Sequence, residues 1–310
     1  MKKKIVYEIK ALYRDDLRIT GYEFGKGKKS VCIVGCSRGN EVQQLYVCSQ
    51  LVKRLKKLEE EGKLTAGHRI LVIPSINPYS MNIKKRFWPT DNTDINRMFP
   101  GYDLGETTQR IAAGVFGAIK DYTYGMQFTS FYMPGRFTPH VRMMKVGYED
   151  VELAKQFGMP YVVLRNTRPY DTTTLNYNWQ IWDTKAFSIY TATTTQIDRE
   201  SAAQAIRAIL NFLAKQGILT YHGHDGYRSM VVEDTDMVPV RTKTAGIFEG
   251  IVRVGEEVSK GQPLANILDP YEGEVKEQLT APVDGIVFFA HDDPLTYANT
   301  AVYKLITREA

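Results

Sequence analysis

Hydrophobic residues in the first two-thirds of this 310-residue chain form short apolar runs that alternate with longer stretches of helical spacing. The apolar runs predict buried strands at residues 30–35, 69–74 and 160–164. The helical spacing predicts helices at residues 41–60, 107–121, 149–157 and 201–215. Strands that alternate with helices are typical of an α/β fold, so we expect a mostly parallel mixed sheet flanked by helices.

The hydrophobic pattern changes near Tyr221 to short apolar strands separated by glycine, proline and aspartate, with no further stretch of helical spacing. Residues 245–247 and 282–287 look like two copies of one unit, in which a turn of small residues leads into an apolar strand. We therefore expect an α/β domain at residues 1–225 and an all-β domain at residues 226–310.

The all-β part resembles the biotinyl/lipoyl-like barrel-sandwich fold. The matching segments are residues 245–248, 254–258, 260–264 and 281–285. Carrier domains of that fold present a modified lysine at an exposed hairpin, whereas the hairpin at residues 270–274 has no lysine at its tip. The resemblance therefore implies a structural or gating domain here and not a carrier domain.

Composition narrows the class of protein. The net charge of +5 is spread along the chain and does not predict nucleic-acid binding. No apolar stretch reaches the ~20 residues that span a bilayer, and the first ten residues do not form a signal peptide. We expect a cytoplasmic protein without a membrane or nucleic-acid partner, and the sequence leaves open whether it forms a homo-oligomer.

Four polar segments could build a ligand site. They are residues 34–41 (VGCSRGNE), 94–101 (DINRMFPG), 121–123 (DYT) and 139–142 (PHVR). The first follows a predicted strand, the third ends a predicted helix and begins a strand, and the fourth lies in a loop. Open α/β sheets bind ligands beyond the carboxyl ends of their strands, which is the position of the first segment.

The order and spacing of these segments resemble the succinylglutamate desuccinylase/aspartoacylase family of M14 carboxypeptidase-like zinc hydrolases. That family has the motifs His-Gly-Asn/Asp-Glu, Asp-x-Asn-Arg-x-Phe-Pro-Gly and Asp-Leu-His, followed by a catalytic glutamate. Residues 94–101 match the second motif nearly completely, and residues 75–78 and 197–201 fit as well. The resemblance implies an M14-like fold and a zinc-dependent deacylase of N-acyl amino acids.

The zinc ligands that the resemblance implies are largely replaced in this chain. Arg38 and Thr123 stand at the two histidine positions, so that Glu41 is the remaining ligand. A guanidinium stays protonated and only donates hydrogen bonds, so it cannot bind zinc. Tyr190 or Thr191 stands at the general-base position, depending on a one-residue gap. We therefore predict no cofactor and a non-catalytic or repurposed relative.

Arg38 can take over the electrostatic role of a metal. A guanidinium pairs well with a carboxylate such as that of Glu41, and a buried carboxylate without a cation would be costly. The hypothesis is that the site binds a small anionic molecule, such as an N-acyl amino acid, without activating water.

The resemblance also assigns residues to ligand binding. It implies that Asn96 and Arg97 hold the carboxylate of the ligand, and that Arg142 and His140 line the same site. Simpler roles stay open for some of these residues. Asn96, like Asp94, can turn the loop that contains it, and Arg142 can be a solvent-facing strand residue.

Two other interpretations remain open. An active metallo-amidohydrolase could use relocated zinc ligands, for which His140 or the pair His222 and His224 are candidates, because the pair would share one face of a strand. Alternatively, Cys36 or Ser37 could be a nucleophile at the strand end, if a general base lies near it.

Overall fold

The computed structural model describes residues 1–13 and 15–308, which form two compact units. The first unit comprises Met1–Ser130 and His140–Ser229, and the second comprises Phe131–Pro139 and Met230–Ala310. The segment Phe131–Pro139 groups with the second unit although it lies inside the first predicted domain. The boundary between residues 225 and 226 therefore stays a prediction.

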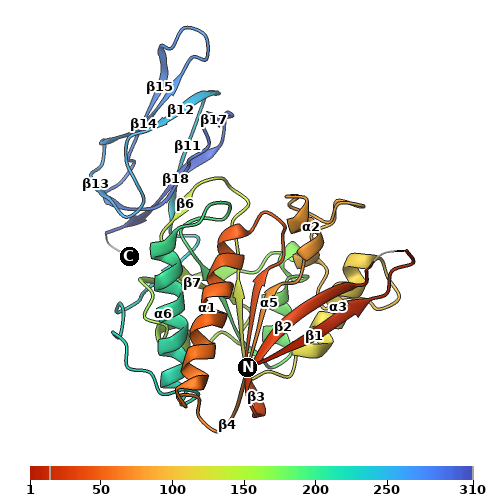
Figure 1. The fold of residues 1–310 in the computed structure, drawn as a ribbon. Helices are drawn as coiled ribbons and strands as arrows, with labels where there is room; N and C mark the ends of the chain where they lie inside the picture. The colour runs from red at the N-terminus through yellow and green to blue at the C-terminus, as the bar shows by residue number, and fades with distance from the viewer. Residues whose placement is uncertain (14, 309–310) are drawn as a thin grey trace. The chain divides into compact units, whose positions relative to one another are not determined.

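The first unit is built around one mixed sheet, whose strands lie in the order β1-β2-β4-β3-β5-β9-β7-β8 (Figure 1). The strands are β1 (Lys2–Ile9), β2 (Leu17–Gly25), β3 (Gly27–Cys36), β4 (Gly67–Ser75), β5 (Tyr124–Phe128), β7 (His140–Lys145), β8 (Tyr161–Asn166) and β9 (Lys185–Tyr190). The pairs β3/β4, β3/β5, β5/β9 and β7/β8 are parallel, whereas β1, β2 and β4 pair antiparallel and β7 runs antiparallel to β9.

Helices cover both faces of this sheet. They are α1 (Val42–Glu60), α2 (Pro78–Asn82), α3 (Thr107–Ile119), α4 (Val151–Lys155), α5 (Leu175–Ile181) and α6 (Arg199–Lys215), with 3-10 turns η1 (Ile95–Arg97) and η2 (Pro169–Asp171). Helices α1 and α6 lie side by side over one face (Figure 1). Helices α3 and α5 pack on the other face, where Trp179 and Val115 share a core with Val34 and Ile73 of the sheet.

The second unit is an antiparallel all-β structure with two sheets. One sheet has the order β11-β18-β16-β13, with β6 paired to β16, and the other has the order β15-β14-β12-β17. The strands of these sheets are β6 (Arg136–Phe137), β11 (Val238–Arg241), β12 (Gly246–Gly250), β13 (Glu257–Val258), β14 (Pro263–Leu268), β15 (Val275–Thr280), β16 (Gly285–Ala290), β17 (Leu295–Thr296) and β18 (Ala301–Thr307). Strand β10 (Met230–Glu233) belongs to neither of these two sheets. Leu264, Ile267, Val287 and Leu305 are at its core.

The structure confirms the predicted fold class, a mostly parallel mixed sheet with helices followed by an all-β region. Each predicted strand and helix is present, with ends shifted by at most three residues. The β1–β2 hairpin and α5 were not predicted. Among the described residues, no helix combines the length and apolar character needed to cross a bilayer.

Candidate functional site

The carboxyl ends of three parallel strands meet at one edge of the sheet. Strands β3, β5 and β9 end there at Cys36, Phe128 and Tyr190. Strand β7 is antiparallel to β9, so it begins at this edge, with His140 opposite Tyr190. The structure therefore gathers the segments after these strands with the start of β7, as the strand order requires.

Glu41 is fully buried at this edge and accepts hydrogen bonds on both carboxylate oxygens. Its Oε2 accepts from the backbone N–H groups of Ser37, at 2.7 Å, and Arg38, at 3.0 Å. Its Oε1 accepts from the Ser130 hydroxyl at 2.5 Å and from Nη1 of Arg38 at 3.2 Å. The protein itself thus satisfies this buried charge.

Arg38 connects two carboxylates. Its side chain is buried, and on the side away from Glu41 its Nε and Nη2 donate to one oxygen of Asp94, at 3.0 and 2.8 Å. Burial alone would lower the pKa of Arg38, but the charges of Glu41 and Asp94 outweigh it and raise that pKa. Arg38 therefore carries a permanent positive charge between two acids.

The loop after this network is fixed by its own hydrogen bonds. Asp94 caps η1, because its second oxygen accepts from the backbone N–H of Asn96 at 3.0 Å. The side-chain oxygen of Asn96 accepts from Nε2 of Gln127, on β5, at 2.7 Å. Asp94 therefore both turns the loop and binds Arg38, and Gln127 ties that loop to the sheet.

The family resemblance put Thr123 at a zinc-ligand position beside Glu41, but Thr123 does not lie there. It precedes β5, its side chain is exposed, and its hydroxyl donates to the carbonyl of Lys29 at 3.5 Å. Because β5 runs parallel to β3 with Tyr124 opposite Val31, Thr123 is at the amino edge of the sheet and Glu41 at the carboxyl edge. The residues that follow β5 at the correct edge are Thr129 and Ser130.

The residues around Glu41 do not fit the zinc site of the M14-like hydrolases. Zinc needs three or four thiolate, imidazole or carboxylate ligands, whereas Glu41 is surrounded by the donors Arg38 and Ser130. Within the described part of the chain, no group of three or more histidine, cysteine, aspartate or glutamate side chains could hold a metal ion. A cation at Glu41 would have to displace Arg38.

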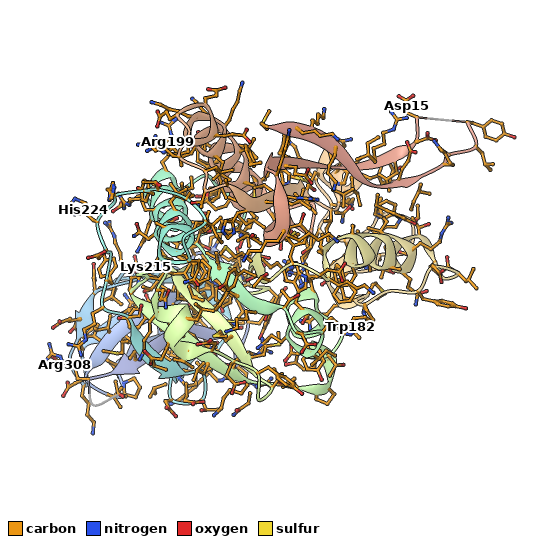
Figure 2. The ribbon with its side chains drawn as sticks, turned by 90° about the horizontal axis from the view of Figure 1, so that it is seen from below. Asp15, Trp182, Arg199, Lys215, His224 and Arg308 are labelled. Carbon is orange, nitrogen blue, oxygen red and sulfur yellow. The ribbon has the colours of Figure 1, made fainter. Side chains whose placement is uncertain are left out.

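The histidines proposed as relocated ligands do not gather with Glu41 into such a group. His222 and His224 are exposed and follow α6 in a segment without regular structure, where Figure 2 shows His224. The spacing had suggested that they lie on a strand, and this expectation is wrong. His140 is fully buried and stacks on the ring of Tyr190, with centroids 4.7 Å apart and an interplanar angle of 5°.

The general-base position holds no acid. Tyr190 ends β9, and the guanidinium of Arg142 lies 4.6 Å from its ring centroid. Thr191 is buried, and its hydroxyl donates to the carbonyl of Thr193 at 3.2 Å. Tyr190 therefore organises His140 and Arg142 by ring contacts, and Arg142 is buried and not solvent-facing.

The alternative nucleophiles are held in an unreactive state. Burial, together with the charge of Glu41, raises the pKa of Cys36 to about 12, so its thiolate is scarce at neutral pH. Its Sγ donates to the carbonyl of Pro74 at 3.1 Å. The Ser37 hydroxyl is buried and donates to Glu41 at 3.4 Å. The carboxylate of Glu41 also accepts from Arg38.

Arg97, predicted to bind the ligand's carboxylate, already has partners. Its Nη1 donates to the carbonyl of Tyr170 at 2.6 Å and to the buried carboxylate of Asp171 at 3.2 Å. Arg165 binds the other oxygen of Asp171 at 3.1 Å. A ligand would have to share Arg97 with Asp171, so the binding role of Arg97 stays a prediction.

Arg86 is a site residue that the sequence reasoning missed. Burial lowers its pKa, and so does the nearby charge of Arg38, while its backbone carbonyl accepts from Gly39 at 3.0 Å. Over residues 1–13 and 15–308, its guanidinium makes no hydrogen bond or ion pair, and Phe87 lies 5.3 Å below it. In the sequence, the basic run Lys84-Lys85-Arg86 before the Asp94 motif was the signal that could have indicated Arg86.

Buried oxygens without partners mark the end of β5. They are Oε1 of Gln44, Oε1 of Gln127 and the hydroxyl of Thr129, none of which has a hydrogen-bond partner in the described part of the chain. Buried polar groups are nearly always bonded, so such atoms indicate places that water or a ligand completes. The polar site is therefore larger than the pair Arg38 and Glu41.

Comparison with known proteins shows which family the chain is similar to. The family profile described as the succinylglutamate desuccinylase/aspartoacylase catalytic domain matches residues 27–215, which is more than half of the chain. The N-alpha-acetyl-L-2,4-diaminobutyric acid deacetylase of Halomonas elongata is 23% identical over 282 residues, covering 87% of this chain and 79% of the relative.

Solved structures show the same fold. A succinylglutamate desuccinylase from Silicibacter sp. TM1040 superposes with a TM-score of 0.80 at 20% identity, covering 98% of this chain and 93% of that one. A succinylglutamate desuccinylase/aspartoacylase from Rhodobacter sphaeroides gives 0.77 at 22% identity, covering 94% and 89%. With the match over residues 27–215, this chain belongs to the succinylglutamate desuccinylase/aspartoacylase family.

Proposed function

We propose that this member of the family binds a small anionic molecule of the N-acyl amino acid class without hydrolysing it through zinc. The observation that supports this most directly is the guanidinium of Arg38, which lies between Glu41 and Asp94. It puts a fixed positive charge where the family resemblance places a zinc ligand. The charge can attract an anion, but it cannot lower the pKa of a bound water as a metal does.

The missing general base supports the same function. Hydrolysis of an amide needs a group that takes a proton from water, and Tyr190 and Thr191 have ring contacts and a backbone hydrogen bond in that position. Glu41 is the nearby carboxylate, but its oxygens accept from Arg38 and Ser130. Its lone pairs are therefore directed at protein donors.

An excess of guanidinium groups favours an anionic ligand. Arg38 is balanced by Glu41 and Asp94, whereas Arg86 has no carboxylate of its own among the described residues. Guanidinium groups bind carboxylates through paired hydrogen bonds, and a half-buried one does so with less competition from water. The Halomonas relative is named for an N-acetylated amino acid, which supports that ligand class.

The family membership itself supports a second candidate, an active deacylase. Its named relatives are a deacetylase and succinylglutamate desuccinylases, and such an activity here would need ligands that rearrange around Glu41. The metal content of the purified protein distinguishes the active deacylase from the protein that only binds its ligand. We expect protein purified without chelators to hold far less than one zinc per chain by elemental analysis, and stoichiometric zinc would overturn the proposal.

Ligand binding is tested by calorimetry with N-acetylated amino acids, N-acetylaspartate and N-acetyl-2,4-diaminobutyrate among them. Arg86→Gln is expected to weaken binding about 10- to 100-fold, the typical contribution of a charged hydrogen bond. Lys85→Gln is the matched control, because it removes the same charge from the exposed neighbouring residue. Equal binding by both variants, or release of acetate from the ligand, would contradict the proposal.

A further inference from the structure

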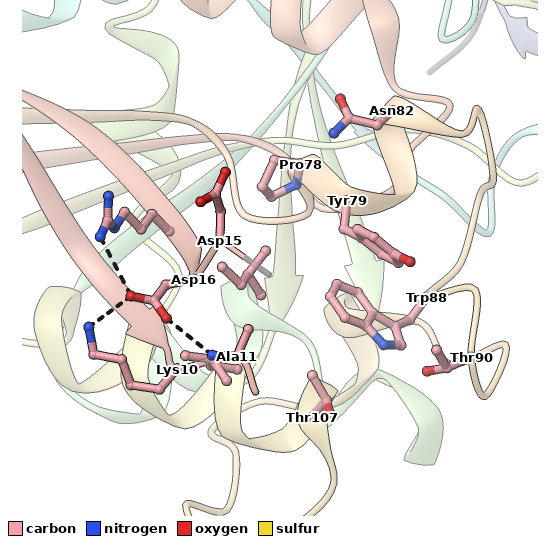
Figure 3. Close-up of a pocket in the computed structure, with 13 residues that line it drawn as sticks. Lys10, Ala11, Asp15, Asp16, Pro78, Tyr79, Asn82, Trp88, Thr90 and Thr107 are labelled. Carbon is pink, nitrogen blue, oxygen red and sulfur yellow. Dashed lines mark hydrogen bonds and ion pairs between the residues drawn. The ribbon is translucent and has the colours of Figure 1, made fainter. Parts of the chain in front are cut away.

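A cavity of about 550 Å³ lies between the end of the β1–β2 hairpin and the segment from α2 to Thr90 (Figure 3). Its volume is in the range of small-molecule pockets, which is roughly 300–1,000 Å³. Arg38, Glu41 and Asp94 are not among its lining residues, so it is distinct from the site at the carboxyl edge of the sheet.

Two aromatic side chains form one wall of this cavity. The rings of Tyr79 and Trp88 have centroids 5.3 Å apart and are tilted by 41°, and Figure 3 shows them side by side. Trp88 is 6% exposed, so its ring is held by the protein, whereas Tyr79 is 36% exposed and reaches the opening. The pair offers an apolar aromatic surface to a ligand.

The aromatic wall is fixed by hydrogen bonds on both sides. Asn77 caps α2 by accepting from the backbone N–H of Ser80 at 3.2 Å, and its amide donates to the carbonyl of Ser37 at 3.2 Å. The Ser80 hydroxyl donates to the carbonyl of Phe87, next to Trp88, at 3.1 Å. The cavity is therefore largely formed before any ligand binds, which lowers the entropic cost of binding.

The opposite wall is charged, and its cations already have partners. Lys10 binds Asp16 at 2.8 Å (Figure 3). Lys10 also binds Glu8 at 2.9 Å, and Arg18 binds Glu8 at 2.6 Å. Asp15, which also lines the cavity, makes no hydrogen bond or ion pair with any described residue. The wall thus presents one carboxylate that no described side chain binds directly, although its charge contributes to the raised pKa of Arg18.

We infer that this cavity binds a small organic amine, whose ammonium pairs with Asp15 while a flat apolar body lies against Tyr79 and Trp88. An ammonium group is attracted both to a carboxylate and to the faces of aromatic rings. Among the described residues that line the cavity, an anion would meet Asp15 without an unpaired cation, because Lys10 and Arg18 are paired with Asp16 and Glu8. The charge pattern therefore selects an amine over an acid.

Calorimetry with tryptamine and with indole-3-propionate tests this inference, because the two share an indole ring and differ in charge. Tryptamine is expected to bind saturably at millimolar concentrations or below, and indole-3-propionate is not. Asp15→Asn and Tyr79→Ala are each expected to weaken tryptamine binding roughly fivefold or more. Asp292→Asn, which changes an exposed aspartate of the second unit, is expected to leave binding unchanged.

Three results would overturn the inference: no saturable binding of tryptamine, equal binding of both indoles, or undiminished binding by Asp15→Asn. The circular dichroism spectrum and the unfolding midpoint of each variant show whether a loss of binding reflects lost structure. Binding of N-acetylated amino acids is expected to be the same in Asp15→Asn and in the unsubstituted protein. That measurement distinguishes this cavity from the site at the carboxyl edge of the sheet, which includes Arg86. The amine inference and the proposed function can therefore fail independently of each other.

Discussion

The guanidinium of Arg38 lies 3.2 Å from the carboxylate of Glu41, and both groups are buried. Two residues lie between them in the sequence, the spacing at which the family resemblance expects a histidine and a glutamate that share a zinc ion. The pair therefore keeps that spacing in the sequence, but a guanidinium and not a metal ion lies against the carboxylate. The predictions below test the consequences of that replacement.

Zinc binding is expected to return when both histidine positions are restored at the carboxyl edge. Arg38→His with Thr129→His places two imidazoles near Glu41, since Thr129 directly follows β5. We expect this double variant to bind about one zinc ion per chain, measured by elemental analysis after dialysis. Arg38→His with Thr123→His is the control, because Thr123 is at the amino edge, and similar zinc uptake by both would contradict the assigned geometry.

Removing the cation from the pair is expected to destabilise the fold. Arg38→Met leaves Glu41 and Asp94 without their shared partner, and such a loss in a buried pair costs about 3–5 kcal/mol. Adding Glu41→Gln should recover part of this loss, since the unpaired charge disappears. Urea unfolding of the single and double variants measures it, and strictly additive effects would show that the two side chains are not coupled.

The three cysteines are expected to resist alkylation in the native state. Cys32, Cys36 and Cys48 are free and buried, and burial together with the charge of Glu41 raises the pKa of Cys36 to about 12. At pH 8 the thiolate of Cys36 is then about one part in ten thousand. Mass spectrometry after iodoacetamide treatment should show unmodified native protein and three labels after unfolding, whereas fast native labelling would argue against this burial.

Two glycines of α3 should respond oppositely to alanine. A Cβ at Gly117 meets nothing within 4 Å, so Gly117→Ala is expected to stabilise the protein by about 0.5–1 kcal/mol through helix propensity. A Cβ at Gly114 would lie 2.1 Å from the ring of Tyr7 on β1, so Gly114→Ala is expected to destabilise by roughly 1–3 kcal/mol. Thermal unfolding compares them, and equal shifts would mean that Tyr7 moves freely.

Hydrophobic periodicity determined most of the fold. The runs that became β3, β4 and β8 are apolar and β-branched, and the helical stripes of α1, α3 and α6 pack against the sheet as their spacing predicts. The β1–β2 hairpin escaped prediction because its strands mix charged and apolar residues, and most of β1 is only partly buried. The segment Phe131–Pro139 carries no local signal for its pairing with β16.

The sequence by itself determined that Arg38 cannot be a zinc ligand, because the identity of a side chain fixes what it can coordinate. Only the tertiary structure decided which residues stand beside it. The resemblance put Thr123 at the second histidine position, but the parallel register of β3 and β5 places Thr123 at the amino edge of the sheet and Thr129 at the carboxyl edge. Arg86 approaches the same network through a loop, and distances across loops depend on packing that no periodic pattern records.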